Sequence, residues 1–326
     1  MHLPIRPRRL RGSALLREMI SDVRLSRFDV VAPLFICPGE RVRKPVASMP
    51  DVFQMSADVA MLEIKELEQR GVPAFILFGV TDKSLKDAVG SHAHRPDNEV
   101  CRTLGKVKDA GIKMLAITDL CYCEYTNHGH CGPITPNGNV DNDTTAERLG
   151  QQAVLHARAG ADIIAPSGMM DGAIAAIRSA LDADGKTDTA ILSYAVKYAS
   201  AYYGPFRDAA DSAPQFGDRK TYQMDARRDN RDAVREALLD VEQGADMIMV
   251  KPGVAYLDVL RDVTQAVNVP TAVYQVSGEY SMIKAAAANG WVDEKTIVLE
   301  TMTAFKRAGA SFVLTYYAKK IAEWLG

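Results

Sequence analysis

The sequence lacks both a long apolar run and a strong charge of one sign. No apolar segment approaches the ~18 residues that a membrane-spanning helix needs, and no hydrophobic signal core follows the basic N-terminal stretch. The 326 residues include 39 Lys and Arg against 41 Asp and Glu, a formal net charge of −2, so the basic excess typical of nucleic-acid-binding proteins is missing. These absences predict a cytoplasmic protein with no nucleic-acid or membrane partner.

Cysteine is also scarce, and its number is odd. Five cysteines in a chain without a secretion signal argue against a disulfide framework. Three of them, Cys121, Cys123 and Cys131, lie in one short segment. Thiolates are soft ligands that favour zinc over magnesium or calcium, and three protein ligands leave a fourth position for water or substrate. The cluster therefore predicts a zinc site, with three ordinary core cysteines as the alternative.

What the chain does contain is a repeat of short apolar runs, usually followed by segments of helical period. Alternation with short connections requires parallel strands, so eight such units predict an α/β fold, a (β/α)8 TIM barrel. An open doubly wound sheet is the alternative, weakened because no glycine-rich dinucleotide fingerprint follows an early strand. The predicted strands are Val30–Phe35, Ala74–Val80, Lys113–Leu120, Asp162–Pro166, Ala190–Val196, Met247–Val250, Thr271–Val276 and Phe312–Tyr317. Helical segments include Val59–Arg70, Thr144–Ala159, Asp229–Gln243, Tyr256–Val267 and Met282–Asn289.

Two segments do not fit the repeat. Residues 1–29 precede the first strand and are rich in arginine, which favours a solvated or subunit-clasping arm over contact with nucleic acid. Residues 198–228 form an unusually long link between the fifth and sixth strands, rich in Tyr, Phe, Arg, Gly and Pro. Long ordered loops in compact domains are often active-site covers. We therefore expect an N-terminal arm and a barrel domain over 30–326 with a lid at about 198–228.

Two lysines follow neighbouring predicted strands, Lys197 the fifth and Lys251 the sixth. Strand alternation places Lys197 on the same face as Ser193 and Ala195, whose small side chains leave room. Burial and mutual repulsion would lower the pKa of at least one ammonium group towards neutrality. A neutral amine attacks a ketone to form a Schiff base, which predicts covalent catalysis. A solvated strand-end lysine is the alternative for either residue alone.

The motifs around these residues resemble those of the porphobilinogen synthase (5-aminolevulinate dehydratase) family over nearly the whole chain. They are DLCYC at 119–123, GHCG at 129–132, YGPFRDA at 203–209, FGDR at 216–219, MVKPG at 249–253 and YQVSGEY at 274–280. The resemblance implies a barrel with an N-terminal arm, assembled as a homo-octamer. It also implies the condensation of two 5-aminolevulinate molecules to porphobilinogen with loss of two waters, a lyase step of heme biosynthesis.

The same resemblance implies a role for each matching residue. Lys251 would hold the first substrate as a Schiff base and Lys197 the second. Zinc on the three cysteines would act as a Lewis acid toward the second substrate. Asp119 and Ser167 match the site of the first amino group, Ser277 and Tyr316 the first carboxylate site, and Arg207, Arg219 and Gln223 the second carboxylate site. Glu236 matches an allosteric magnesium ligand of bacterial relatives, with a solvated helix glutamate as the alternative.

Two other functions fit part of the pattern. A class I aldolase-like barrel would use one Schiff-base lysine without a metal, and the second lysine and the cysteine triplet argue against it. A zinc-dependent assembly protein would keep both lysines as ordinary ammonium groups around a closed structural metal site.

Overall fold

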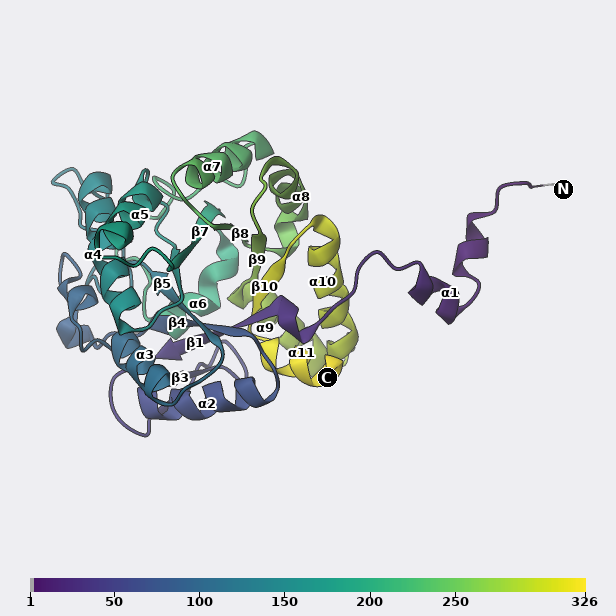
Figure 1. Cartoon of the computed structure of the whole chain (residues 1–326), viewed down its shortest axis with the longest axis horizontal. Helices are drawn as coiled ribbons and strands as arrows, with labels where there is room; N and C mark the ends of the chain where they lie inside the picture. The colour runs from purple at the N-terminus through teal and green to yellow at the C-terminus, as the bar shows by residue number, and fades with distance from the viewer. Residues whose placement is uncertain (1–2) are drawn as a thin grey trace.

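A computed structural model describes residues 3–326, and its centre is a closed ring of eight parallel strands (Figure 1). The strands are β1 (Val30–Ile36), β4 (Ala74–Gly79), β5 (Leu115–Leu120), β6 (Ile163–Pro166), β7 (Ala190–Lys197), β8 (Met247–Lys251), β9 (Thr271–Gln275) and β10 (Phe312–Thr315). Each pairs with the next, and β10 pairs back with β1 through Val30 opposite Val313. This closure confirms the predicted barrel and excludes the open sheet.

Helices surround the ring and follow the strands in the chain. They are α2 (Ala57–Gln69), α3 (Glu99–Asp109), α4 (Asn142–Ala159), α5 (Ala173–Ala183), α7 (Asn230–Glu242), α8 (Leu257–Ala266), α9 (Ser277–Ala288), α10 (Glu294–Ala308) and α11 (Ala318–Leu325). Local sequence sets their ends: the Asp141 carboxylate accepts the N–H of Thr144 at the start of α4, and Gly160 ends that helix with φ 115°. Helix α9 begins five residues earlier than the predicted Met282, directly after β9.

A short hairpin that the sequence did not predict completes the wall beside β1. It consists of β2 (Arg43–Pro45) and β3 (Phe53–Met55), and β3 pairs in parallel with Phe35 and Ile36. The β1–β10 ladder covers only Val30 and Val31. Pro33 lies between these two pairings and has no N–H to donate, which suits a point where one neighbouring strand ends and another takes over.

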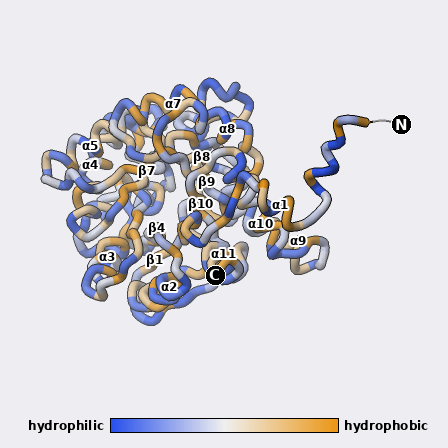
Figure 2. Tube along the Cα trace, turned by 45° about the vertical axis from the view of Figure 1, so that its right-hand side comes forward, coloured by the Kyte–Doolittle hydropathy of each residue, from blue (hydrophilic) through white to orange (hydrophobic). Residues whose placement is uncertain are grey.

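The segment before β1 extends away from the barrel (Figure 1). It contains three short elements, η1 (Pro7–Arg11), α1 (Ala14–Met19) and η2 (Arg27–Asp29), and none of them buries a residue. Charged and apolar residues mix along it (Figure 2), and Ile5 and Leu15 are 82% and 80% exposed. Met1 and His2 of the predicted arm lie outside the described residues.

The link between β7 and β8 contains η5 (Ala201–Tyr203) and α6 (Gly204–Ala210), followed by a long loop. We call residues 198–228 the lid segment. An isolated bridge pairs Tyr198 with Met224, so the segment leaves and rejoins the barrel at one place. Among residues 3–326, no helix has the length and apolar character needed to cross a membrane.

Candidate active site

The two lysines meet at the carboxyl ends of their strands. Lys197 and Lys251 are the last residues of β7 and β8 and lie directly opposite each other in the ladder. Each side chain belongs to a residue that is only 5% exposed. Their Nζ atoms lie 5.5 Å and 5.1 Å from the ring centre of the same Tyr194. The barrel therefore brings both amines into one buried region, which we name the lysine pocket, on the face where barrel enzymes carry their catalytic groups.

Lys197 reaches this pocket by a route that simple alternation did not predict. The Ser193 hydroxyl donates to Asp240 of α7, so Ser193 faces the outer helix layer. Between Ser193 and Val196 the register against β8 slips by one residue, a β-bulge. Because of this extra residue, Lys197 faces inward together with Tyr194. The expectation that Lys197 shares a face with Ser193 and Ala195 is therefore wrong.

Aromatic rings surround the amine of Lys251. Its Nζ lies 4.4 Å, 5.0 Å and 5.3 Å from the ring centres of Tyr274, Phe206 and Tyr203. Burial, followed by the positive charge of Lys197, lowers the pKa of Lys251 to about 7, although Asp119 opposes the shift. A large fraction of this amine is therefore neutral near pH 7 and can act as a nucleophile.

The amine of Lys197 has a polar environment instead. Its Nζ donates to the backbone oxygen of Ser167 at 2.5 Å, and the Ser167 hydroxyl donates to Asp119 Oδ2 at 3.1 Å. Burial raises the pKa of Asp119 to about 6, against the opposing effect of the two lysines. Its other oxygen, Oδ1, is buried and has no hydrogen-bond partner among the described residues. Such an oxygen can accept an amino-group proton from a bound molecule.

The three clustered cysteines converge as the sequence predicts. Cys121, Cys123 and Cys131 are buried, none forms a disulfide, and their sulfur atoms lie within 4.8 Å of one another. Hydrogen bonds from the Cys121 and Cys123 thiols lower the pKa of Cys131 well below its usual value. Three thiols at this spacing, one of them with a lowered pKa, fit a soft metal ion such as zinc.

Neither histidine of the cysteine segment belongs to that cluster. His128 Nε2 lies 3.1 Å from the backbone oxygen of Ala88. The two ring nitrogens of His130 contact the lid segment, at Phe216 O and at the hydroxyl of Tyr222. Among residues 3–326, the only metal-ligand cluster formed by His, Cys, Asp or Glu is that of the three cysteines.

The lid segment supplies cationic and amide donors. Arg219 Nη2 donates to the backbone oxygens of Ser212 and Gly129 at 2.6 Å and 2.8 Å. The Nε atoms of Arg207 and Arg219 and the Nε2 atom of Gln223 are buried without an acceptor in the described part of the chain. Burial, followed by the charge of Arg219, lowers the pKa of Arg207. Three buried donors that lack acceptors are suited to an anion such as a carboxylate.

Ser277 and Tyr316, the predicted first carboxylate site, already have partners. The Ser277 hydroxyl accepts the N–H of Phe206 at 2.9 Å and donates to the oxygen of Tyr202 at 3.3 Å. The Tyr316 hydroxyl lies 3.0 Å from that of Tyr274, the ring closest to Lys251 among those described. Ser277 thus fastens the start of the lid segment, while Tyr316 lies at the edge of the aromatic environment.

Glu236 does not belong to the lysine pocket. It lies on α7 beside a cavity of about 320 Å³ whose lining includes Asp171 and Asp240. Burial, followed by the charges of Asp240, Asp171 and Asp232, raises the pKa of Glu236. Repulsion within this acidic group would fall if a cation bound there.

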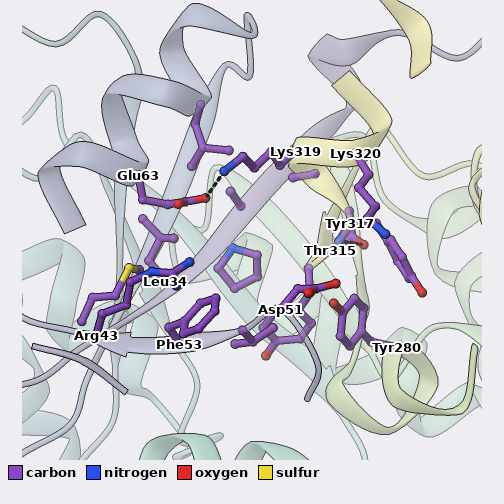
Figure 3. A pocket seen from close by; sticks show the side chains of 17 residues that line it. Leu34, Arg43, Asp51, Phe53, Glu63, Tyr280, Thr315, Tyr317, Lys319 and Lys320 are labelled. Atoms are coloured by element: carbon purple, nitrogen blue, oxygen red, sulfur yellow. Dashed lines mark hydrogen bonds and ion pairs between the residues drawn. The ribbon is translucent and has the colours of Figure 1, made fainter. Parts of the chain in front are cut away.

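A separate pocket of about 360 Å³ opens between the β2–β3 hairpin, α2 and α11 (Figure 3). Its labelled charged side chains include Glu63 and Lys319, which form an ion pair. Lys320 pairs with Glu294. Tyr316 is the only predicted site residue in its lining, so this hollow is distinct from the lysine pocket.

Sequence reasoning missed the rings around Lys251. The motifs that carry the resemblance contain three of these aromatic residues, Tyr203, Phe206 and Tyr274, so the sequence offered a reason to place them near Lys251. Tyr194 had no comparable signal, because only the bulge after it reveals that it points inward with Lys197. The partners of His128 and His130 likewise emerge only from the fold.

Comparison with known proteins agrees with this geometry. A family model described as delta-aminolevulinic acid dehydratase matches residues 4–324. The chain belongs to this family. The delta-aminolevulinic acid dehydratase of Synechococcus elongatus is 53% identical over 323 residues, with 98% of each chain covered. That of Bacillus subtilis is 50% identical over 320 residues, again with 98% of each covered.

A solved member of the delta-aminolevulinic acid dehydratase family has the same fold throughout. The Toxoplasma gondii enzyme, determined in complex with its reaction product porphobilinogen, is 43% identical and superposes with a TM-score of 0.96. The match covers 99% of this chain and 92% of that one. A dihydropteroate synthase from Xanthomonas albilineans, 10% identical with a TM-score of 0.51 over 93% of this chain and 92% of that one, shares the barrel fold alone.

Proposed function

We infer that the protein is a porphobilinogen synthase, a lyase that condenses two molecules of 5-aminolevulinate into porphobilinogen and two waters. The observation that carries this inference is a pair of buried lysines in one pocket with the three-thiol cluster close by: Lys197 and Lys251 face each other, and Lys197 contributes to the electrostatic environment of Cys131. Membership of the dehydratase family supports it, and so does the relative determined with porphobilinogen. Neither a one-lysine aldolase nor a non-enzymatic zinc protein explains why a second amine is buried or why the chain belongs to the dehydratase family.

The first step belongs to Lys251. Its neutral amine attacks the ketone carbon of one 5-aminolevulinate and a C–N bond forms; the C–O bond then breaks, water leaves, and with the uptake of one proton an iminium results. Tyr194, Tyr274 and Phe206 exclude bulk water from the amine, which keeps the nucleophilic form populated. Asp119 and Ser167 receive the amino group of this substrate, and Ser277 with Tyr316 receives its carboxylate.

The second substrate binds on the Lys197 side of the pocket. Lys197 forms the corresponding iminium, which acidifies the neighbouring carbon and creates a second electrophile. Arg207, Arg219 and Gln223 bind its carboxylate with donors that lack acceptors in the described chain. Arginine suits this role because its planar guanidinium donates two parallel hydrogen bonds to a carboxylate.

Cys121, Cys123 and Cys131 would hold a zinc ion, which supplies Lewis acidity toward the second substrate when bound. The acidic group around Glu236 would bind a regulatory magnesium ion.

We further propose that residues 1–29 clasp a neighbouring subunit in a homo-octamer, and that the protein is cytoplasmic. Exposed apolar residues along the N-terminal segment support the assembly role.

Borohydride trapping tests the proposed chemistry. The protein is incubated with 5-aminolevulinate, reduced with borohydride, digested and mapped by mass spectrometry. We expect adducts on Lys251 and, at lower yield, on Lys197. An adduct on a single lysine that forms equally well after metal removal, with no porphobilinogen, would support the aldolase-like alternative. No adduct on either lysine in the metal-loaded protein would reject the mechanism.

A further inference from the structure

The loop that ends in Cys131 is fastened to the lid segment. We call residues 127–132 the metal-ligand loop and residues 211–222 the lid tip. The backbone N–H of Gln215 donates to the oxygen of His128 at 3.0 Å, and Arg219 donates to the oxygen of Gly129. Gly129 has φ 72° and packs directly against the Ala213 backbone oxygen, where no Cβ atom would fit. The two segments are therefore in backbone contact.

The imidazole of His130 joins the same two segments through both ring nitrogens. The residue is 4% exposed, and its ring centre lies 4.7 Å from that of Phe216. Nε2 lies 3.0 Å from the Phe216 carbonyl oxygen, which can only accept, so Nε2 carries the hydrogen. In a neutral ring Nδ1 must then accept, and the Tyr222 hydroxyl lies 3.1 Å from it. One tautomer satisfies both contacts, and neither nitrogen is left for a metal ion.

The lid tip carries Arg219, one of the three donors that the proposed function assigns to the second substrate. Arg219 lies between Phe216 and Tyr222 in the chain, and Gln223 follows directly. The Arg219 guanidinium also contacts the metal-ligand loop, so its position depends on how the two segments are joined. Any movement of the lid tip away from the metal-ligand loop would carry Arg219 and Gln223 with it.

We propose that His130 is a positioning residue that latches the lid tip onto the metal-ligand loop, so that metal binding and closure of the second carboxylate site favour each other. This proposal rests on the proposed function, because it takes the zinc and carboxylate sites from it. His130 touches neither substrate nor metal and acts through Arg219 and Gln223. Coupling between two binding sites is reciprocal. If metal binding favours closure of the carboxylate site, then an anion bound at Arg219 also tightens metal binding.

Limited proteolysis of the full-length protein tests the latch without measuring turnover. Lys220 and Arg227 are exposed in the lid segment and are trypsin sites. We compare wild type, His130→Asn, Tyr222→Phe and the control His92→Gln, each with zinc or a chelator. His92 is a buried histidine bonded to Glu99, with no hydrogen bond to the lid segment or the metal-ligand loop. Circular dichroism establishes that each variant is folded.

We expect zinc-loaded His130→Asn to be cleaved in the lid roughly tenfold faster than wild type, with Tyr222→Phe intermediate and His92→Gln unchanged. Chelation should accelerate cleavage of wild type but add little in His130→Asn. The KM for 5-aminolevulinate should rise several-fold with a smaller change in kcat. Wild-type cleavage rates in both latch variants, or equal acceleration by chelation in all proteins, would overturn the latch.

Two further measurements separate this proposal from its rivals. Zinc content of His130→Asn should stay within about twofold of wild type at saturating zinc, whereas a collapse in zinc content with normal lid cleavage would identify His130 as a metal ligand instead. Borohydride should still trap substrate on Lys251 in His130→Asn. If wild type itself forms no adduct, the proposed function fails, while the proteolysis result still decides whether the lid tip is latched.

Discussion

Lys251 and Lys197 are the same residue type at adjacent positions of one ladder, yet the fold prepares them differently. The Lys251 amine lies among aromatic rings, and burial brings its pKa to about 7. The Lys197 amine is anchored on the Ser167 carbonyl. An aromatic ring does not replace the hydrogen bonds that water makes to an ammonium group, whereas a carbonyl oxygen replaces one of them. The position of each lysine in its strand thus determines where the amine lies, and the groups around each amine determine which of the two reacts first.

The largest effect on activity is expected for Lys251→Met. Without the activated amine we expect turnover to fall by on the order of 10⁴-fold, while the melting temperature changes little because Met fills an apolar environment. Initial rates of porphobilinogen formation and a thermal melt measure the two effects. A variant that keeps more than a tenth of wild-type activity would show that Lys251 is not the nucleophile.

Lys197→Met should cost somewhat less turnover, on the order of 10³-fold, and should leave the first step intact. One equivalent of 5-aminolevulinate should still be trapped on Lys251 by borohydride. Loss of this Lys251 adduct in Lys197→Met would mean that the two amines act as a unit and that the assigned order is wrong.

Cys123→Ala should act mainly on the step that involves the second substrate. Removing one of three thiols should weaken zinc binding at least roughly 100-fold, as measured with a competing chelator, and slow condensation. The Lys251 adduct should persist, with Cys37→Ala, a buried cysteine outside the cluster, as the control. Unchanged zinc affinity would contradict the ligand assignment.

The pH profile tests the charge state of Lys251. Below its pKa of about 7 Lys251 is protonated, so kcat/KM should fall about tenfold per pH unit on the acid side. The Asp119 carboxylate raises the pKa of Lys251, and its removal in Asp119→Asn should therefore shift this limb to lower pH by about one unit. A limb that moved upward would reverse the assigned electrostatics.

Phe206→Ala should produce the smallest effect. Losing a ring 5.0 Å from Lys251 Nζ admits water, which raises the pKa of Lys251 and moves the acid limb up by roughly half a unit. The profile should return toward wild type in Phe206→Leu, which restores bulk without the ring. An unshifted limb in Phe206→Ala would show that the other rings alone desolvate the amine.

Much of this molecule could be predicted from its sequence, because much of it is periodic or local. Eight apolar runs gave the barrel, and three closely spaced cysteines gave the thiol cluster. The β2–β3 hairpin escaped prediction because its strands have only three residues each, too few for a pattern. The partners of Ser277 and His130 escaped too, since they come from the lid segment, far away in the chain. Such contacts depend on how a long loop folds back, which local propensity does not encode.

The bulge in β7 is the one place where the local rule gave the opposite of the fold. No glycine or proline marks it; the residues between the two registers are Tyr194 and Ala195. One inserted position reverses the parity of every side chain downstream in that strand. In a regular strand with Tyr194 facing inward, the residue three positions later would face outward, toward the helix layer where Ser193 contacts Asp240. The second amine therefore shares the inner face of the barrel with Tyr194, three residues earlier, only because the bulge accommodates one extra residue between them.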